Sequence, residues 1–143
     1  MNKFCSTIFV ALSLMFFSLT LALAQDAAQP SAEAMEAVIA IEDWAIAPAI
    51  ENLSPQSTAQ SFPATVGTLY CFTKVVGARE ETSITHTWYY QDREMAKVIL
   101  SVRSRYWRTW SSKKIIPGWR GSWRVEVTAE DGTLLKSIDF TVE

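Results

Sequence analysis

Short runs of alternating apolar and polar residues recur from Val38 to the C-terminus, and turn-forming residues separate them. The clearest run is SWRVEVTA, in which Trp123, Val125 and Val127 alternate with polar neighbours. A period of two places alternate side chains on opposite faces of a β-strand, whereas an amphipathic helix needs a period near 3.6. About seven such runs at intervals of roughly ten residues predict an all-β chain, folded as a single antiparallel immunoglobulin-like β-sandwich.

The same pattern predicts where strands and connections lie. Residues 38–50 are expected to form an edge or bulged strand because they contain Pro48, and residues 65–76 a central strand because both faces are apolar. Residues 51–64 and the basic segment 111–118 are expected to be loops, and Asp131-Gly132 a hairpin turn. The other strands are expected at 83–90, 95–105, 106–110, 122–129 and 134–142.

The first 24 residues have the pattern of a signal peptide. Lys3 precedes an apolar run, and Ala22-Leu23-Ala24 forms a small-x-small cleavage site. We therefore expect export, with cleavage near Ala24 and a periplasmic or secreted product; a retained membrane anchor is the alternative. Residues 25–37 are expected to be an acidic flexible linker, and residues 38–143 the β-sandwich domain.

Charge is divided unevenly along the chain. From Gln25 to Gln60 there are six acidic residues and no lysine or arginine, whereas from Ser61 onward there are 12 basic and nine acidic residues. The overall net charge of -2 hides this division. The sequence thus indicates an acidic segment followed by a basic body.

The cysteine and histidine content argues for structural roles. Cys71 is the only cysteine outside the predicted signal peptide, so we expect a buried, unreactive thiol, with an intermolecular disulfide as the alternative. His86 is the only histidine and alternates in phase with Ile84 and Trp88, so we expect it to be packed and hydrogen-bonded.

Catalytic and metal-binding patterns are not found in the sequence. One histidine and one cysteine cannot make a tetrahedral zinc site without carboxylates, and no aspartate-rich calcium loop is present. There is no G-x-S-x-G nucleophile motif and no glycine-rich phosphate loop. We therefore expect no cofactor, no metal and no enzymatic activity.

The most distinctive stretch is residues 97–124. It contains eight lysines and arginines, four of the six tryptophans and no carboxylate. The hypothesis is a surface that contacts an anionic envelope polymer or an acidic protein; nucleic acid offers similar chemistry but is disfavoured by export, and the mature chain is expected to have no membrane contact. The candidate residues are Arg103, Arg105, Arg108, Trp110, Lys113, Lys114, Trp119 and Arg120.

A structural role for the same residues is the alternative hypothesis. Guanidinium groups stacked on indoles contribute about 0.5–2 kcal/mol each, so a ladder of such pairs would stiffen a sandwich that has no disulfide. In an assembly version of this hypothesis, the acidic lead-in docks on the basic face of its own or a neighbouring domain. The ligand and the oligomeric state are left open by the sequence.

Several stretches together resemble a bacterial exported family, domain of unknown function 2914. They are LYCFTKV, ITHTWYY, WRTWSSK, GSWRVEV, the Asp-Gly turn and a final DFTV, in that order from about Ile41 to the C-terminus. In that family an acidic-Arg-Glu-Pro run usually precedes the first strong strand, but here the corresponding residues read ENLSP, without the arginine and that glutamate. The resemblance implies an envelope location and a compact, β-rich domain, and it implies no activity.

Overall fold

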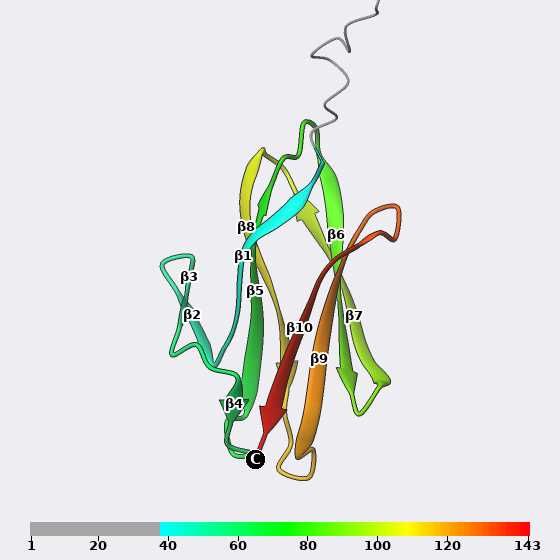
Figure 1. Ribbon diagram of the computed structural model, residues 1–143. Coiled ribbons are helices and arrows are strands. Elements are labelled where there is room, and N and C mark those ends of the chain that lie inside the picture. Colours follow the sequence, from blue (N-terminus) through cyan, green and yellow to red (C-terminus); the bar gives the residue numbers. More distant parts are fainter. Residues whose placement is uncertain (1–37) are drawn as a thin grey trace, which may run out of the picture. The chain divides into compact units, whose positions relative to one another are not determined.

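The computed structural model describes residues 38–143, and all regular structure in that range is β-strand (Figure 1). The predicted signal peptide (1–24) and linker (25–37) lie outside the described residues. The strands are β1 (Ala40–Ala47), β2 (Ala49–Glu51), β3 (Ser54–Gln56), β4 (Ser61–Phe62), β5 (Thr68–Val76), β6 (Thr82–Tyr90), β7 (Arg93–Val102), β8 (Tyr106–Lys114), β9 (Gly121–Ala129) and β10 (Leu134–Val142).

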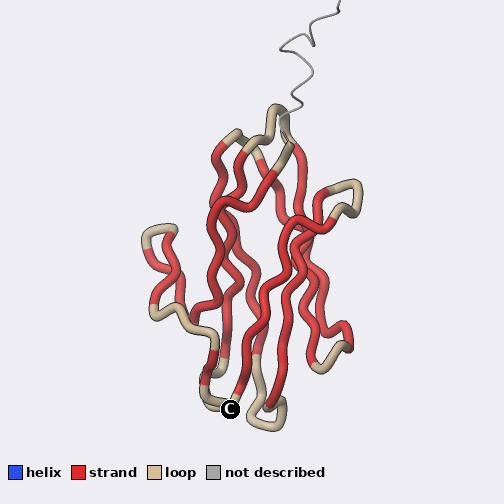
Figure 2. Tube along the Cα trace, in the orientation of Figure 1, coloured by secondary structure: helices blue, strands red, loops and turns tan. Residues whose placement is uncertain are grey.

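Two sheets form a sandwich, as the alternating pattern predicted. One has the order β1-β5-β8 and the other β4-β10-β9-β6-β7, while β2 and β3 form a separate ribbon. Figure 2 shows strands over most of the described chain and no helix between them. Within residues 38–143, accordingly, no helix could span a membrane.

The seven long strands have the order expected of an immunoglobulin-like sandwich. With β1, β5 and β8 lettered A, B and E, and β10, β9, β6 and β7 lettered G, F, C and C′, the sheets read A-B-E and G-F-C-C′. The predicted count of about seven is met by these strands, and β2, β3 and β4 are short additions. Strand D, which would pair with the outer edge of β8, has no counterpart within residues 38–143.

The core lies between the two sheets, and it includes Trp123, Val125 and Val127, the alternating apolar positions of the SWRVEVTA run. Leu69, Cys71 and Val75 face inward from β5, and the other sheet supplies a larger set: Ile84, Trp88, Val102, Trp123, Val125, Val127, Ile138, Phe140 and Val142. Phe140 contacts the rings of Phe62, Trp88 and Trp123 at centroid distances of 6.0–6.2 Å. Since burying one large apolar side chain contributes about 1.5–3 kcal/mol, this cluster stabilises the sandwich without a disulfide.

The hairpin predicted at Asp131-Gly132 is confirmed. Gly132 has φ +88, its N–H bonds to the Ala129 carbonyl at 2.9 Å, and Thr133 N–H donates to Asp131 Oδ1 at 2.9 Å. β1 is an edge strand, as predicted. Its bulge lies between Ile41 and Asp43 and not at Pro48, where the predicted strand 38–50 divides into β1 and β2.

Two segments expected to be loops contain strands. Residues 51–64 include β3 and β4, and the β2–β3 turn places Asn52 and Leu53 at positive φ, 50° and 59°. A two-residue turn of this kind ordinarily has asparagine followed by glycine. Because Leu53 stands where glycine is usual, the sequence did not indicate a turn here. Residues 111–114 likewise extend β8, because Ser111 is buried and hydrogen-bonded within the core rather than solvated.

A chain of hydrogen bonds crosses the core between the two sheets. Trp88 Nε1 donates to Ser111 Oγ at 3.0 Å, and Ser111 Oγ lies 2.8 Å from His86 Nδ1. His86 Nε2 lies 3.2 Å from Thr73 Oγ1, which donates to the Thr109 carbonyl at 3.3 Å. Trp88 and His86 belong to β6, whereas their partners belong to β5 and β8.

These hydrogen bonds indicate the tautomer of His86, and its burial keeps it neutral. The Thr73 hydroxyl donates to a carbonyl, so His86 Nε2 must donate to Thr73, and Nδ1 must accept from Ser111. His86 is fully buried, and desolvation lowers its pKa from 6.5 to about 4. The predicted packed, hydrogen-bonded histidine is confirmed, and it is neutral.

We expect acid to destabilise the fold through His86. The folded-state pKa is lowered, so between pH 6.5 and about 4 the unfolded chain takes up a proton that the folded chain does not. The free energy of unfolding should fall by about 3 kcal/mol across this window. Urea titrations at both ends should show a larger loss for the wild type than for His86→Gln; parallel pH profiles would contradict the assignment.

The two neighbouring serines of β8 offer a matched test of the hydrogen-bond chain. Ser111→Ala leaves Trp88 Nε1 and His86 Nδ1 without their buried partner and should cost about 2–4 kcal/mol of unfolding free energy. Ser112→Ala, on the exposed face, should change it by less than about 0.5 kcal/mol. Equal effects in urea denaturation would mean that the bonds do not bridge the sheets.

Candidate functional site

The predicted surface does not form one patch, because its residues lie at three places. Arg103 and Arg105 lie in the β7–β8 turn, where Arg103 Nε is 3.7 Å from Glu81 Oε1. They were expected to continue a strand, but β7 ends at Val102. The residues that line a shallow hollow at this turn include acidic and basic side chains together: Ala78, Arg79, Glu80, Glu81, Arg103, Ser104 and Arg105.

At the opposite end of β8, the predicted residues serve packing. Lys113 Nζ lies over the Trp119 ring, 5.2 Å from its centroid. Trp119 packs against Tyr90 and Trp123, and its carbonyl accepts from Trp123 Nε1 at 3.1 Å. These contacts hold the connection between β8 and β9, so Trp119 is partly buried rather than free to bind. Lys114 and Arg120 are exposed nearby.

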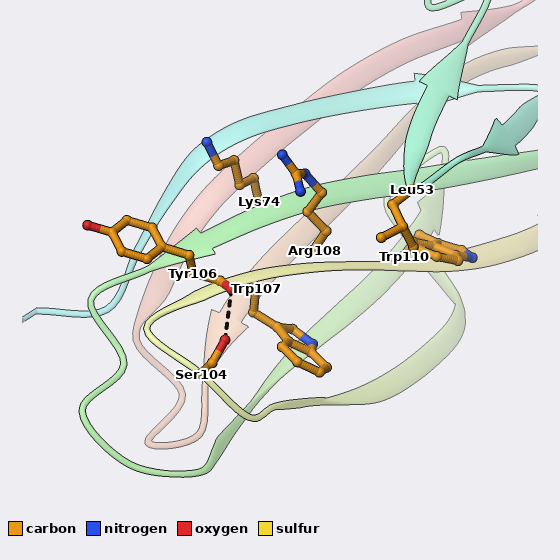
Figure 3. A pocket seen from close by; sticks show the side chains of 7 residues that line it. All are labelled: Leu53, Lys74, Ser104, Tyr106, Trp107, Arg108 and Trp110. Carbon is orange, nitrogen blue, oxygen red and sulfur yellow. Dashed lines mark hydrogen bonds between the residues drawn. The ribbon is translucent and has the colours of Figure 1, made fainter.

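Arg108 and Trp110 lie on the outer face of the three-stranded sheet. On β8 the side chains of Trp107 and Ser111 point to the core side, so Tyr106, Arg108 and Trp110 point to the outside. In register, Arg108 is opposite Lys74 of β5, and Trp110 is opposite Phe72. Figure 3 shows Lys74 and Arg108 projecting from the same face, with Trp107 on the other side of β8.

The β2–β3 ribbon completes this part of the sheet. Both of its strands contact β5, and Phe72, although on the outer face, is only 2% exposed. Leu53, in the β2–β3 turn, lines the same pocket as Trp110 (Figure 3). Leu53 has a positive φ, which is a strained conformation for leucine. Strained residues of this kind are often found at active sites and ligand-binding sites.

The β2–β3 turn, β5, the β7–β8 turn and β8 line a pocket of about 640 Å³ that is open to solvent. Its lining residues are Leu53, Lys74, Ser104, Tyr106, Trp107, Arg108 and Trp110. We call its outward-facing members Leu53, Lys74, Tyr106, Arg108 and Trp110 the β8 face. Leu53 and Tyr106 are 56% and 66% exposed, so large apolar surface remains open to solvent here.

The two cations of the β8 face differ in their partners. Lys74 forms an ion pair with Glu42 of β1. Arg108 has no ion pair or hydrogen bond from its side chain within residues 38–143, and it is exposed. The face therefore presents one uncompensated guanidinium between two aromatic rings, an arrangement suited to an anionic or aromatic group.

The pocket is lined by cationic, aromatic and hydroxyl side chains together with one leucine. Its lining contains no carboxylate, imidazole or thiol. In the described part of the chain, no three His, Cys, Asp or Glu side chains converge as metal ligands would. His86 is buried between the sheets, so it cannot act on a bound substrate.

Stacking of arginine on tryptophan, proposed as a stabilising ladder, is not found in the basic stretch. Arg103, Arg105, Arg108, Arg120 and Arg124 lie over no indole in the described chain; Arg124 instead stacks on Tyr89 at 4.6 Å. The other pairs are Lys113 on Trp119 and Lys136 on Trp44. Arg124 also pairs with Asp92 and Glu126 on the five-stranded sheet, away from Arg103 and Arg105.

Sequence reasoning missed Tyr106, Lys74 and Leu53. Tyr106 could have been found, because it precedes Arg108 and Trp110 at strand spacing. Lys74 joins the site only through the β5–β8 register, and Leu53 only through the fold of the ribbon. No local pattern could have indicated either.

Comparison with known families bears on the C-terminal strands. The family described as Protein of unknown function (DUF2914) matches residues 81–142. This region belongs to that family. The DUF2914 match covers β6 to β10 and thus Tyr106, Arg108 and Trp110, while LYCFTKV and the ribbon lie before it. No curated protein matches the chain.

Cys71 is fully buried in β5, and burial raises the pKa of its thiol. With Cys5 replaced by serine, the native protein should not react with a thiol-specific disulfide reagent at about pH 8, and it should react fully once unfolded in urea. Rapid reaction of the native protein, or a disulfide-linked dimer on non-reducing gels, would instead support the intermolecular disulfide.

Proposed function

We propose that this protein is a non-enzymatic binding or accessory module, exported to the bacterial envelope, that engages an anionic ligand through the β8 face. Export is supported by the signal-peptide pattern of residues 1–24. The candidate ligands are an anionic envelope polymer and an acidic protein surface, as the basic composition of the stretch suggested.

The observation that carries this proposal is the open pocket around Arg108. Arginine, tyrosine and tryptophan are the side chains most enriched where proteins bind partners, and here one of each lies on successive outward positions of one strand. Arg108 is left without an internal partner, and Tyr106 is left 66% exposed. Neither feature contributes to packing of the core.

The proposal narrows the predicted surface. Arg108 and Trp110 remain in it, and Tyr106, Lys74 and Leu53 join them. Lys113 and Trp119 are better explained by their mutual contact, which fastens the β8–β9 connection. A purely structural role for the domain would leave the β8 face unexplained, since the observed cation–π pairs lie elsewhere.

Salt-dependent retention on an acidic polysaccharide or an immobilised acidic protein tests the proposal. Arg108→Ala should weaken binding about tenfold, because a charge-assisted hydrogen bond to an anion is lost. Trp110→Ala should weaken it as well, without lowering the charge. For the wild type, affinity should fall as ionic strength rises.

Arg120→Ala and Arg103→Ala are the matched controls, because each removes one positive charge outside the pocket. They should elute close to the wild type, and thermal melting should verify that every variant is folded. If all single-charge variants shift equally, or if Trp110→Ala has no effect, retention reports net charge and the β8 face is not a binding site.

A further inference from the structure

The outer edge of β8 presents backbone groups that no strand within residues 38–143 pairs with, because β8 is the last strand of the sheet. Gly77 N–H donates to the Arg105 carbonyl and Ile115 N–H donates to the Gly67 carbonyl, so odd-numbered residues carry the ladder to β5. The pairing is regular between these points. The N–H and C=O groups of Tyr106, Arg108, Trp110, Ser112 and Lys114 therefore point away from β5. The Tyr106 carbonyl accepts a hydrogen bond from Ser104 Oγ at 2.8 Å (Figure 3), so the open groups of the edge begin after it.

The other sheet edges are blocked in ways that proteins commonly use. β1 is bulged at Glu42, has a second acidic residue at Asp43 and is followed by Pro48. β7 is bulged beside Tyr89 and carries charges of both signs, and β4 has two residues only. Bulges, charges and short length each discourage pairing with another chain. β8 is nine residues long, without a bulge or a proline.

The pocket extends around this open edge. Tyr106, Arg108 and Trp110 line it from the outer face of β8, whereas Trp107 lines it from the opposite face (Figure 3). Only a ligand lying alongside the strand can contact side chains of both faces. An extended polypeptide does so, because its own side chains alternate between the two faces of the sheet.

We propose that β8 accepts an extended acidic segment of a partner polypeptide as an added antiparallel or parallel strand. The outward backbone groups of Arg108, Trp110 and Ser112 bind the main chain of that segment, and its carboxylates lie beside Arg108 on the outer face. Apolar side chains on alternate positions pack on Tyr106 and Trp110, or on Trp107 at the other face. This inference rests on the proposed function and specifies its ligand and its mode of binding.

Charge indicates why the occupant is an acidic strand and not a second copy of β8. β8 carries Arg108, Lys113 and Lys114 and no acidic residue. Two such strands side by side would bring six cations together, and like charges on adjacent strands are destabilising. The same cations attract a segment rich in glutamate or aspartate, so they select the partner while opposing self-association.

Amide hydrogen exchange on the full chain provides the direct test, with a short peptide of alternating glutamate and valine as the probe. Binding should slow exchange at Arg108, Trp110 and Ser112, whose amides point outward, while the amides of Thr109 and Ser111 are protected by β5 with or without the peptide. A peptide of alternating lysine and valine should not bind, and a glutamate–proline peptide, which lacks alternate donors, should bind weakly.

Two substitutions at position 108 separate the contribution of the backbone N–H to peptide binding from that of the positive charge. Arg108→Ala removes the guanidinium and keeps the outward N–H, whereas Arg108→Pro removes both. Proline is tolerated on an edge strand when its missing N–H faces solvent, as it does here. We expect Arg108→Pro to bind the glutamate–valine peptide about tenfold more weakly than Arg108→Ala. Protection of the ladder amides in each variant shows whether β8 remains folded.

Each outcome decides the proposal. Slowed exchange at alternate amides, with a further loss in Arg108→Pro, supports strand addition. If polygalacturonate binds and depends on Arg108 and Trp110 while the peptide does not, strand addition is wrong and the binding function stands. If concentrated protein alone protects the same amides and sediments as a dimer, the occupant is a second copy. If neither probe binds, both the inference and the proposed function fail.

Discussion

The hydrogen-bond chain from Trp88 through Ser111, His86 and Thr73 to the Thr109 carbonyl is the interaction on which the arrangement of the sandwich depends. It joins β6 of one sheet to β5 and β8 of the other, where a disulfide joins the sheets of many immunoglobulin domains. Because Ser111 must face the core, every second residue of β8 must face outward. A shift of β8 by one residue would bury Arg108 and expose Ser111, at the cost of an unpaired buried charge and unsatisfied partners. The internal polar chain thus also determines what the surface presents.

β8 combines an exposed binding face with an open strand edge. Tyr106, Arg108 and Trp110 supply apolar area and a free cation on an outer face, and β8 is an unblocked edge strand. An exposed edge with aromatic residues is a risk of aggregation, and the other long edges of this sandwich are bulged and charged. The uniformly positive charge of β8 limits that risk, since it opposes pairing between copies. The β2–β3 ribbon contacts β5 and adds Leu53 to the lining of the pocket, so the pocket has the ribbon at one end.

Much of the fold could be predicted because alternation reports directly on which side chains are buried. The inward residues Trp123, Val125 and Val127 of β9 and the packed position of His86 in β6 were identified, and so were the Asp131-Gly132 hairpin and the edge position of β1. The errors have specific causes. Ser111 is polar, so the pattern ended β8 too early, although hydrogen bonds satisfy that serine in the core. Leu53 occupies a turn position that ordinarily requires asparagine or glycine, so the ribbon was taken for a loop.

The sequence by itself determined the class of fold, the inward residues of β9, the structural role of His86 and the concentration of cations and indoles in one stretch. These properties depend on local periodicity and composition, which a single chain displays directly. Only the tertiary structure decided how that stretch is divided: Arg103 in a turn beside Glu81, Lys113 and Trp119 in a packing contact, and Arg108 and Trp110 at an open pocket. The physical reason is that the exposure of a side chain, and the residues it contacts, depend on residues that are distant in the sequence. Lys74 meets Arg108 through strand pairing, Leu53 reaches the pocket through a ribbon, and β8 is open because no strand D follows β7.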